Sequence, residues 1–355
     1  MAKLRKPKKE VSTLDSKNLF IAKTFNQTIK EAMDMKIPNM LFSEFIFESD
    51  LTILFASAGV GKTMLAIQIA ESIAKGTSIE GFVNESKPQR VLYLDFELSM
   101  KQLEGRYCEV SLVDDKKVWF NQYQWHDNLI RITFNSEVDA RVDVDSVFES
   151  ILAHAHNNNA KVIFIDNITW IAKQGLETSK DAGLLMKKLD KLKKEHNFTL
   201  VVLAHTPKKY TWSPMELIDL AGSMQLANFC DSVFAINFSK LGKSYRYLKQ
   251  VKCRFTENKY HSKNVITAQI TKVDPNFTGY QIETPDEENI LEANHLESKN
   301  ITAIYSEEQI KTNKEKAQEK IKENPTISCR VLADEIDVSH ETANKYLKLF
   351  RHENF

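Results

Sequence analysis

Residues 51–70 read LTILFASAGVGKTMLAIQIA, and this stretch decides the fold. The apolar run at 51–55 predicts a buried strand, and the apolar residues at 64–70 predict a helix. Between them, Gly59 and Gly61 allow turns that point backbone N–H groups inward, beside the positive end of the helix dipole. A strand, a glycine-bearing loop and a helix in this order predict a phosphate-binding loop.

Lys62 and Thr63 complete this motif. Lys62 would reach the β- and γ-phosphates of a nucleoside triphosphate, and the Thr63 hydroxyl would ligate Mg²⁺. We therefore expect ATP and Mg²⁺ as ligands. Ala56 stands where the motif usually has its first glycine, which bears on the first turn of the loop but not on the phosphate contacts. The residues expected to contact the nucleotide are Ser57, Ala58, Gly59, Val60, Gly61, Lys62, Thr63 and Met64.

Acidic residues end two further apolar runs. One run ends at Asp166, which we expect to hold Mg²⁺ together with Thr63. The other ends at Asp95, and Glu97 follows two residues later. This second pattern is similar to the segment that holds the catalytic glutamate in RecA-like ATPases. The resemblance implies that Glu97 orients the attacking water; Asp95 is the competing candidate, and a glutamate that only caps the next turn is the structural alternative.

Two later strands carry polar side chains at positions that RecA-like motors use. His205 ends an apolar run and resembles the γ-phosphate sensor of the plasmid RepA-type hexameric helicases; a plain surface histidine is the alternative. Lys252 and Arg254 share a strand face, because alternate residues do. Such a pair resembles the finger that hexameric RecA-like motors insert into the neighbouring subunit's nucleotide, and a charge-protected edge strand is the alternative. The expected catalytic set is Lys62, Glu97, Asp166, His205, Lys252 and Arg254.

Short apolar runs alternate with helical patterns from residue 51 onward. Strands are predicted at 51–56, 91–95, 131–134, 162–166, 199–205, 232–238, 246–254 and 265–272, and helices at 25–35, 62–75, 144–156 and 181–196. Several strands are apolar on both faces, as in a sheet covered by helices on both sides. The predicted fold class is α/β, with a RecA-like, doubly wound and largely parallel sheet.

The order of these motifs resembles the RecA-like P-loop ATPases of the plasmid RepA-type hexameric helicase family over about residues 40–272. The resemblance implies a homo-oligomer, expected to be a hexamer, that acts on single-stranded DNA. In such motors the loops after the strands that end at Asp166 and His205 face the central channel. Their basic and aromatic residues suit backbone charge and base stacking, although a solvated loop is the alternative. These residues are Lys173, Lys180, Lys208, Lys209, Tyr210 and Trp212.

The segment at 325–348 resembles a helix-turn-helix. Its expected core consists of Val331, Leu332, Ile336, Val338, Ala343 and Leu347, and Ser339 is the expected N-cap of its second helix. His340, Asn344 and Lys345 would face outward, where they could enter a major groove of duplex DNA. From 307 to 355 the chain has nine Lys or Arg against ten Asp or Glu, so docking to a protein is an equal alternative.

Composition bounds the remaining possibilities. The formal net charge is +0, so any nucleic-acid contact must come from local patches. No apolar run is long enough for a membrane span, and the four cysteines form no CxxC pair, so we expect a cytoplasmic protein without structural zinc. The expected divisions are a basic arm and helix at 1–40, an ATPase domain at 41–284, a charged, partly helical linker at 285–322 and the C-terminal module at 323–355.

Three functions fit this pattern. The leading prediction is an ATP-driven DNA motor for replication or mobilisation of DNA. The second is an ATP-controlled switch that assembles on duplex DNA without unwinding it. The third is a regulator that docks a partner protein through the C-terminal module.

Overall fold

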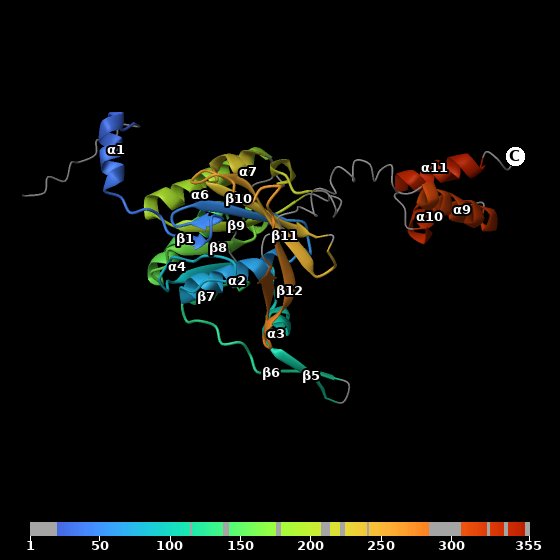
Figure 1. The fold of residues 1–355 in the computed structure, drawn as a ribbon, viewed down its shortest axis with the longest axis horizontal. Helices are drawn as coiled ribbons and strands as arrows, with labels where there is room; N and C mark the ends of the chain where they lie inside the picture. The colour runs from blue at the N-terminus through green and yellow to red at the C-terminus, as the bar shows by residue number, and fades with distance from the viewer. Residues whose placement is uncertain are drawn as a thin grey trace, which may run out of the picture. The chain divides into compact units, whose positions relative to one another are not determined.

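The computed structural model describes residues 20–113, 116–137, 142–174, 179–206, 214–220, 224–239, 241–283, 307–324, 327–336 and 340–351 (Figure 1). It divides into two units, Met1–Pro38 and Asn39–Phe355. The first contains helix α1 (Phe25–Met33), which begins at a Thr24 capping box. None of the residues of α1 is buried, so its apolar side chains are exposed within this unit.

The second unit is built on a nine-stranded sheet. Its strands, in chain order, are β3 (Leu51–Ala56), β4 (Val91–Asp95), β7 (Leu129–Ile132), β8 (Val162–Asp166), β9 (Thr199–His205), β10 (Ser232–Phe238), β11 (Tyr245–Cys253), β12 (Ile266–Asp274) and β13 (Phe277–Ile282). Their order across the sheet is β13-β12-β11-β10-β3-β9-β8-β4-β7. The strands from β10 to β7 pair in parallel, and β11, β12 and β13 add three antiparallel pairs. The predicted RecA-like α/β class is confirmed.

Helices cover both faces of this sheet. On one face lie α2 (Lys62–Lys75) and α3 (Met100–Tyr107), and on the other lie α4 (Val144–Asn157), α5 (Ile168–Ala172), α6 (Ser179–His196), the short 3₁₀ turn Leu217–Asp219 and α7 (Met224–Phe229). Strand β3 is buried on both of its faces, which explains why its sequence is almost wholly apolar. Ile53 and Phe55 pack into the core on one face, whereas Leu54 and Ala56 pack into the core on the other.

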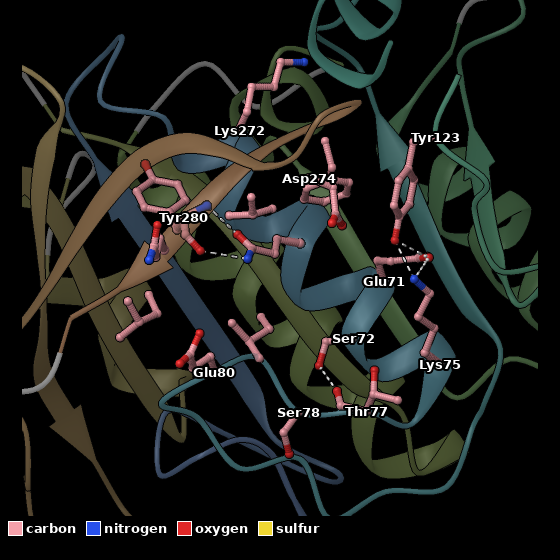
Figure 2. Close-up of a pocket in the computed structure, with 16 residues that line it drawn as sticks. Glu71, Ser72, Lys75, Thr77, Ser78, Glu80, Tyr123, Lys272, Asp274 and Tyr280 are labelled. Carbon is pink, nitrogen blue, oxygen red and sulfur yellow. Dashed lines mark hydrogen bonds and ion pairs between the residues drawn. The ribbon is translucent and has the colours of Figure 1, made fainter. Parts of the chain in front are cut away.

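The antiparallel pair β12–β13 crosses over α2, and we call residues 266–282 the strap (Figure 2). The side-chain amide of Gln68 on α2 pairs with the backbone of Tyr280, donating to its carbonyl at 2.9 Å and accepting from its N–H at 2.7 Å. Lys272 donates to the carbonyls of Arg106 and Cys108 at the end of α3. A half-open cavity of about 410 Å³ lies between the strap and the C-terminal half of α2.

Two small antiparallel pairs complete the second unit before its C-terminal helices. These are β1 (Met40–Phe42) with β2 (Ile46–Phe47), and β5 (Glu109–Val113) with β6 (Lys116–Phe120). The second pair is a hairpin with exposed apolar side chains, among them Leu112 and Phe120. The sequence patterns did not predict either pair, or β13.

Helices α9 (Glu307–Glu323), α10 (Cys329–Glu335) and α11 (His340–Arg351) share one small core. As predicted, Leu332, Ile336, Ala343 and Leu347 are buried there. The prediction for Val331 was wrong: its side chain is 46% exposed, because α10 turns Leu332 and Ala333 toward the core instead. Val338 and Ser339 lie outside the described residues.

None of the helices in the described ranges combines the length and the apolar character needed to cross a lipid bilayer.

Candidate functional site

The phosphate-binding loop lies between β3 and α2. Gly59 and Gly61 have φ angles of 76° and 107°, in the left-handed region that favours glycine. Ala56 is the last residue of β3 and pairs with His205, so its side chain is accommodated in extended backbone and a glycine is not required there. At the start of the loop the Ser57 hydroxyl lies 3.0 Å from that of Thr206, which links the loop to the end of β9.

Lys62 and Thr63 begin α2, and both are buried. Burial lowers the pKa of Lys62, while the carboxylates of Asp166 and Glu97 act in the opposite direction. The lysine therefore faces the two carboxylates that the sequence analysis singled out. Met64, also expected at the nucleotide, follows Thr63 in α2, and its side chain lies beside Gly61.

Asp166 ends β8 and is fully buried. One of its oxygens accepts a hydrogen bond of 2.9 Å from the Tyr93 hydroxyl, whereas the other, Oδ1, is buried and has no hydrogen-bond partner among the residues that the structure describes. Burial raises the pKa of Asp166, and the neighbouring Lys62 and Thr63 lower it.

An unpartnered, buried carboxylate oxygen beside a threonine hydroxyl is a donor set that suits a hard divalent cation. Asp166 and Thr63 therefore fit Mg²⁺, either directly or through one of its waters. A bound Mg²⁺ would supply positive charge against the triphosphate.

Three polar side chains from three different strands converge near Lys62. Asn167, which follows β8, donates to Oε1 of Glu97, which follows β4. His205 at the end of β9 places its Nε2 atom 3.1 Å from the same oxygen and 3.0 Å from the Asn167 amide nitrogen. The hydrogen bond with His205 is the main cause that lowers the pKa of Glu97, and Lys62 adds to it. Glu97 is therefore held as a charged carboxylate.

Asp95, the competing candidate, has both oxygens engaged. Its Oδ1 accepts from the backbone N–H groups of Glu97 and Leu98 at 3.1 and 2.9 Å, and its Oδ2 accepts from Arg131 at 2.9 Å. It is also only 3% exposed. This arrangement shapes the turn that carries Glu97, and it favours Glu97 over Asp95 as the group that can face a water molecule.

Lys252 and Arg254 lie together, but far along the sheet from this chain's own phosphate-binding loop. Cys253 is level with Ser232 and so with Thr52 near the beginning of β3, whereas the loop follows the other end of β3. The Lys252 ammonium donates to the carbonyl of Ala227 and the Arg254 guanidinium to that of Asn228, both at the end of α7. The edge-strand alternative was wrong, because β11 lies between β10 and β12.

The residues expected at nucleic acid are only partly described. Lys173 is exposed just after α5, and Lys180 lies in the first turn of α6. Asn344 and Lys345 are exposed on α11, which begins at His340. The remaining four, Lys208, Lys209, Tyr210 and Trp212, lie outside the described residues.

Sequence reasoning missed Asn167, Tyr93 and Arg131. Asn167 directly follows Asp166, so its position after a strand that ends in a functional carboxylate was a usable signal. Tyr93 and Arg131 lie within strands, where nothing in the pattern distinguishes a side chain that binds Asp166 or Asp95 from one that only packs.

A family model described as an AAA domain matches residues 23–210. The chain belongs to the AAA-domain family. At the level of the family, this assignment confirms the prediction from the sequence that the chain is a RecA-like P-loop ATPase. The matched part of the AAA domain includes the phosphate-binding loop, Glu97, Asp166, Asn167 and His205, but not β10 to β13.

Among solved structures, a KaiC-like protein from the hyperthermophilic archaeon Pyrococcus horikoshii is similar to this chain at 18% sequence identity. The match covers 66% of this chain and 91% of that one, with a TM-score of 0.44. No curated protein sequence matches this chain.

Proposed function

We propose that this AAA-domain protein is an ATP-hydrolysing, DNA-dependent ring motor of the RepA-type helicase kind. The observation that carries the hydrolytic part is the contact of Glu97 with both Asn167 and His205 beside Lys62. A glutamate held charged and oriented by two partners is suited to accept a proton from an attacking water. In the same site Lys62 would bind the phosphates, and Asp166 with Thr63 would hold Mg²⁺.

His205 is suited to couple hydrolysis to movement. It ends β9 and contacts Glu97, while the next residue, Thr206, contacts Ser57 of the phosphate-binding loop. A change in the γ-phosphate could therefore be transmitted to residues 207–213, which the proposal assigns to single-stranded DNA. Lys208, Lys209, Tyr210 and Trp212 would contact its phosphates and bases there, and Lys173 and Lys180 would add charge.

The position of Lys252 and Arg254 in the sheet is an argument for assembly into a ring. They lie at the end of the sheet opposite to their own phosphate-binding loop, so they would act on the nucleotide of a neighbouring subunit. A head-to-tail contact of this kind gives a closed ring when the rotation between neighbouring subunits closes, and we expect a hexamer. In this chain alone, both side chains rest on the carbonyl end of α7, which holds them ready in one place.

The test is the steady-state ATPase rate at several protein concentrations, without DNA, with single-stranded DNA and with duplex DNA, using Lys62→Ala as the blank. The motor predicts stimulation by single strands that increases as subunits assemble, together with strand separation of a forked duplex. Absence of both single-strand stimulation and strand separation would refute it.

A second candidate is an ATP-controlled switch that assembles on duplex DNA without unwinding it. The three-helix core of α9, α10 and α11 favours this candidate, because Asn344 and Lys345 are exposed on α11. Slow hydrolysis stimulated by duplex but not by single strands would support it. A chain ending at residue 283 that retains full DNA stimulation would instead assign the helical module to recruitment of a partner protein.

A further inference from the structure

The backbone carbonyl of Val60 in the phosphate-binding loop accepts two hydrogen bonds from outside the loop. The Nε atom of Arg246 on β11 donates at 2.7 Å, and the hydroxyl of Tyr280 on β13 donates at 3.2 Å. Both donors lie beyond residues 23–210, the part of the chain that the family model matches. No motif in the sequence pointed to either residue.

Both donors are themselves fixed in place. The Arg246 side chain is buried, and its Nη1 atom donates to the carbonyls of Lys243 and Tyr245. Its Cζ atom lies 4.2 Å from the centroid of the Phe238 ring. Tyr280 is 1% exposed, and its backbone is paired with Gln68 on α2 (Figure 2). Because both side chains are already fixed, they can donate to the Val60 carbonyl without a further loss of side-chain freedom.

The Val60 carbonyl and the Gly61 N–H belong to one planar peptide unit, in which the two groups point in opposite directions. Holding the oxygen from behind therefore fixes the direction of the N–H in front. Donation of two hydrogen bonds into the carbonyl also polarises the unit and strengthens its N–H as a donor. Gly61 is needed for this close approach, because a Cβ there would lie 2.3 Å from the Tyr280 hydroxyl oxygen.

We propose that Arg246 and Tyr280 are positioning residues that hold the Val60–Gly61 peptide ready for the triphosphate before any nucleotide binds. The inference rests on nucleotide binding at the proposed site, but not on DNA or on ring formation. A loop that is already in the binding conformation loses no affinity to rearrangement, whereas a loop that visits it only part of the time binds more weakly in proportion.

The first test is Tyr280→Phe, which removes the hydroxyl and keeps the ring. Loss of one of the two donors should weaken the affinity for a fluorescent ATP analogue, measured without DNA, by about three- to tenfold. At saturating ATP the nucleotide itself holds the loop, so kcat should stay within about twofold of the wild type. Tyr107→Phe is the matched control, because Tyr107 is also buried but its hydroxyl has no hydrogen-bond partner within the described ranges.

Arg246→Lys is the second test, because it keeps a positive charge but loses the fork that reaches three carbonyls. It should weaken ATP binding at least as much as Tyr280→Phe does. Unfolding of the nucleotide-free proteins, followed by circular dichroism, separates positioning from stability. Wild-type affinity in Tyr280→Phe would overturn the proposal, and so would a lower kcat and melting temperature at unchanged affinity. Wild-type protein that binds no nucleotide would instead refute the proposed function.

Discussion

The Nε2 atom of His205 lies 3.1 Å from Oε1 of Glu97, although 108 positions separate the two residues in the chain. His205 ends β9 and Glu97 follows β4, and these two strands are not neighbours, because β8 lies between them. Asn167, which follows β8, contacts both. The candidate site is therefore formed at the ends of three adjacent strands. Each of its three side chains can be replaced and tested separately.

Replacing Glu97 with Gln should abolish most turnover while ATP still binds. The amide keeps the size and the contacts of the side chain but cannot accept a proton, so kcat should fall on the order of 10²- to 10⁴-fold. Stopped-time ATPase assays and binding of a fluorescent ATP analogue would measure the two effects. Glu104→Gln, an acidic position on α3, serves as the control and should leave kcat unchanged. Persistent turnover in Glu97→Gln would remove Glu97 from the role of base.

Asn167 and His205 should act through Glu97 and not independently of it. Asn167→Ala and His205→Ala should each lower kcat about tenfold, because each removes one hydrogen bond that orients the carboxylate. In the Glu97→Gln background the same changes should have little further effect, since residues that act as a unit are not additive. Fully additive losses in the double variants would contradict this coupling.

Mixing two inactive variants should restore activity if Arg254 acts on a neighbouring subunit. Lys62→Ala keeps an intact Arg254, and Arg254→Ala keeps an intact phosphate-binding loop, so a mixed ring contains some complete sites. Random assembly in equal amounts should recover about a quarter of the wild-type rate. A mixture of Lys62→Ala with Glu97→Gln is the control, because both changes affect the same subunit's nucleotide site and no complete site forms. Equal rates in both mixtures would exclude a role for Arg254 in trans.

A partly buried carboxylate, Asp50, just before β3 should make stability depend on pH. Burial, and then repulsion from Asp231, raises the pKa of Asp50 from 3.8 to about 7. Since the folded state binds this proton more tightly than the unfolded state, the stabilising contribution is present below pH 3.8 and is lost as pH rises through about 7.

Asp50→Asn removes this ionisation, so it should raise the melting temperature by several degrees at pH 8 and by much less at pH 5. Asp274→Asn, at an exposed position on the strap, is the matched control and should change neither value. A destabilised Asp50→Asn at pH 8 would show that the charged form of Asp50 is the favourable one.

The core strands could be predicted because burial on both faces leaves a plain mark in the sequence. Strands β3, β4, β8, β9 and β10 have the bounds that were predicted from their apolar runs and the polar residues next to them. Strand β7 was placed two residues late, because it lies at the edge of the sheet and carries Arg131, so its run is interrupted. Strands β5, β6 and β13 were missed because exposed or mixed faces make their pattern resemble a loop.

Outside the phosphate-binding loop, whose motif predicted Lys62 and Thr63, the candidate site was predictable where a residue stands at or just after the end of an apolar run. Glu97, Asp166 and His205 could be found in this way, and the structure brings Glu97 and His205 into contact. Arg246 and Tyr280 could not, because their relation to Val60 depends on strands β11 and β13 coming back to the loop over 180 or more positions. Such a contact follows from strand order in space, which local patterns do not encode.

Strand β3 is the middle strand of the nine-stranded sheet, but its two neighbours, β9 and β10, are synthesised only after β4, β7 and β8. At about 5–20 residues per second, a ribosome completes β10 on the order of 10 to 40 seconds after β3 has been synthesised. Until β9 has been made, one of the most apolar segments of the protein has two unpaired edges, and one edge stays unpaired until β10 follows. The yield of folded protein should therefore depend on how the nascent chain is sheltered while the edges of β3 are unpaired.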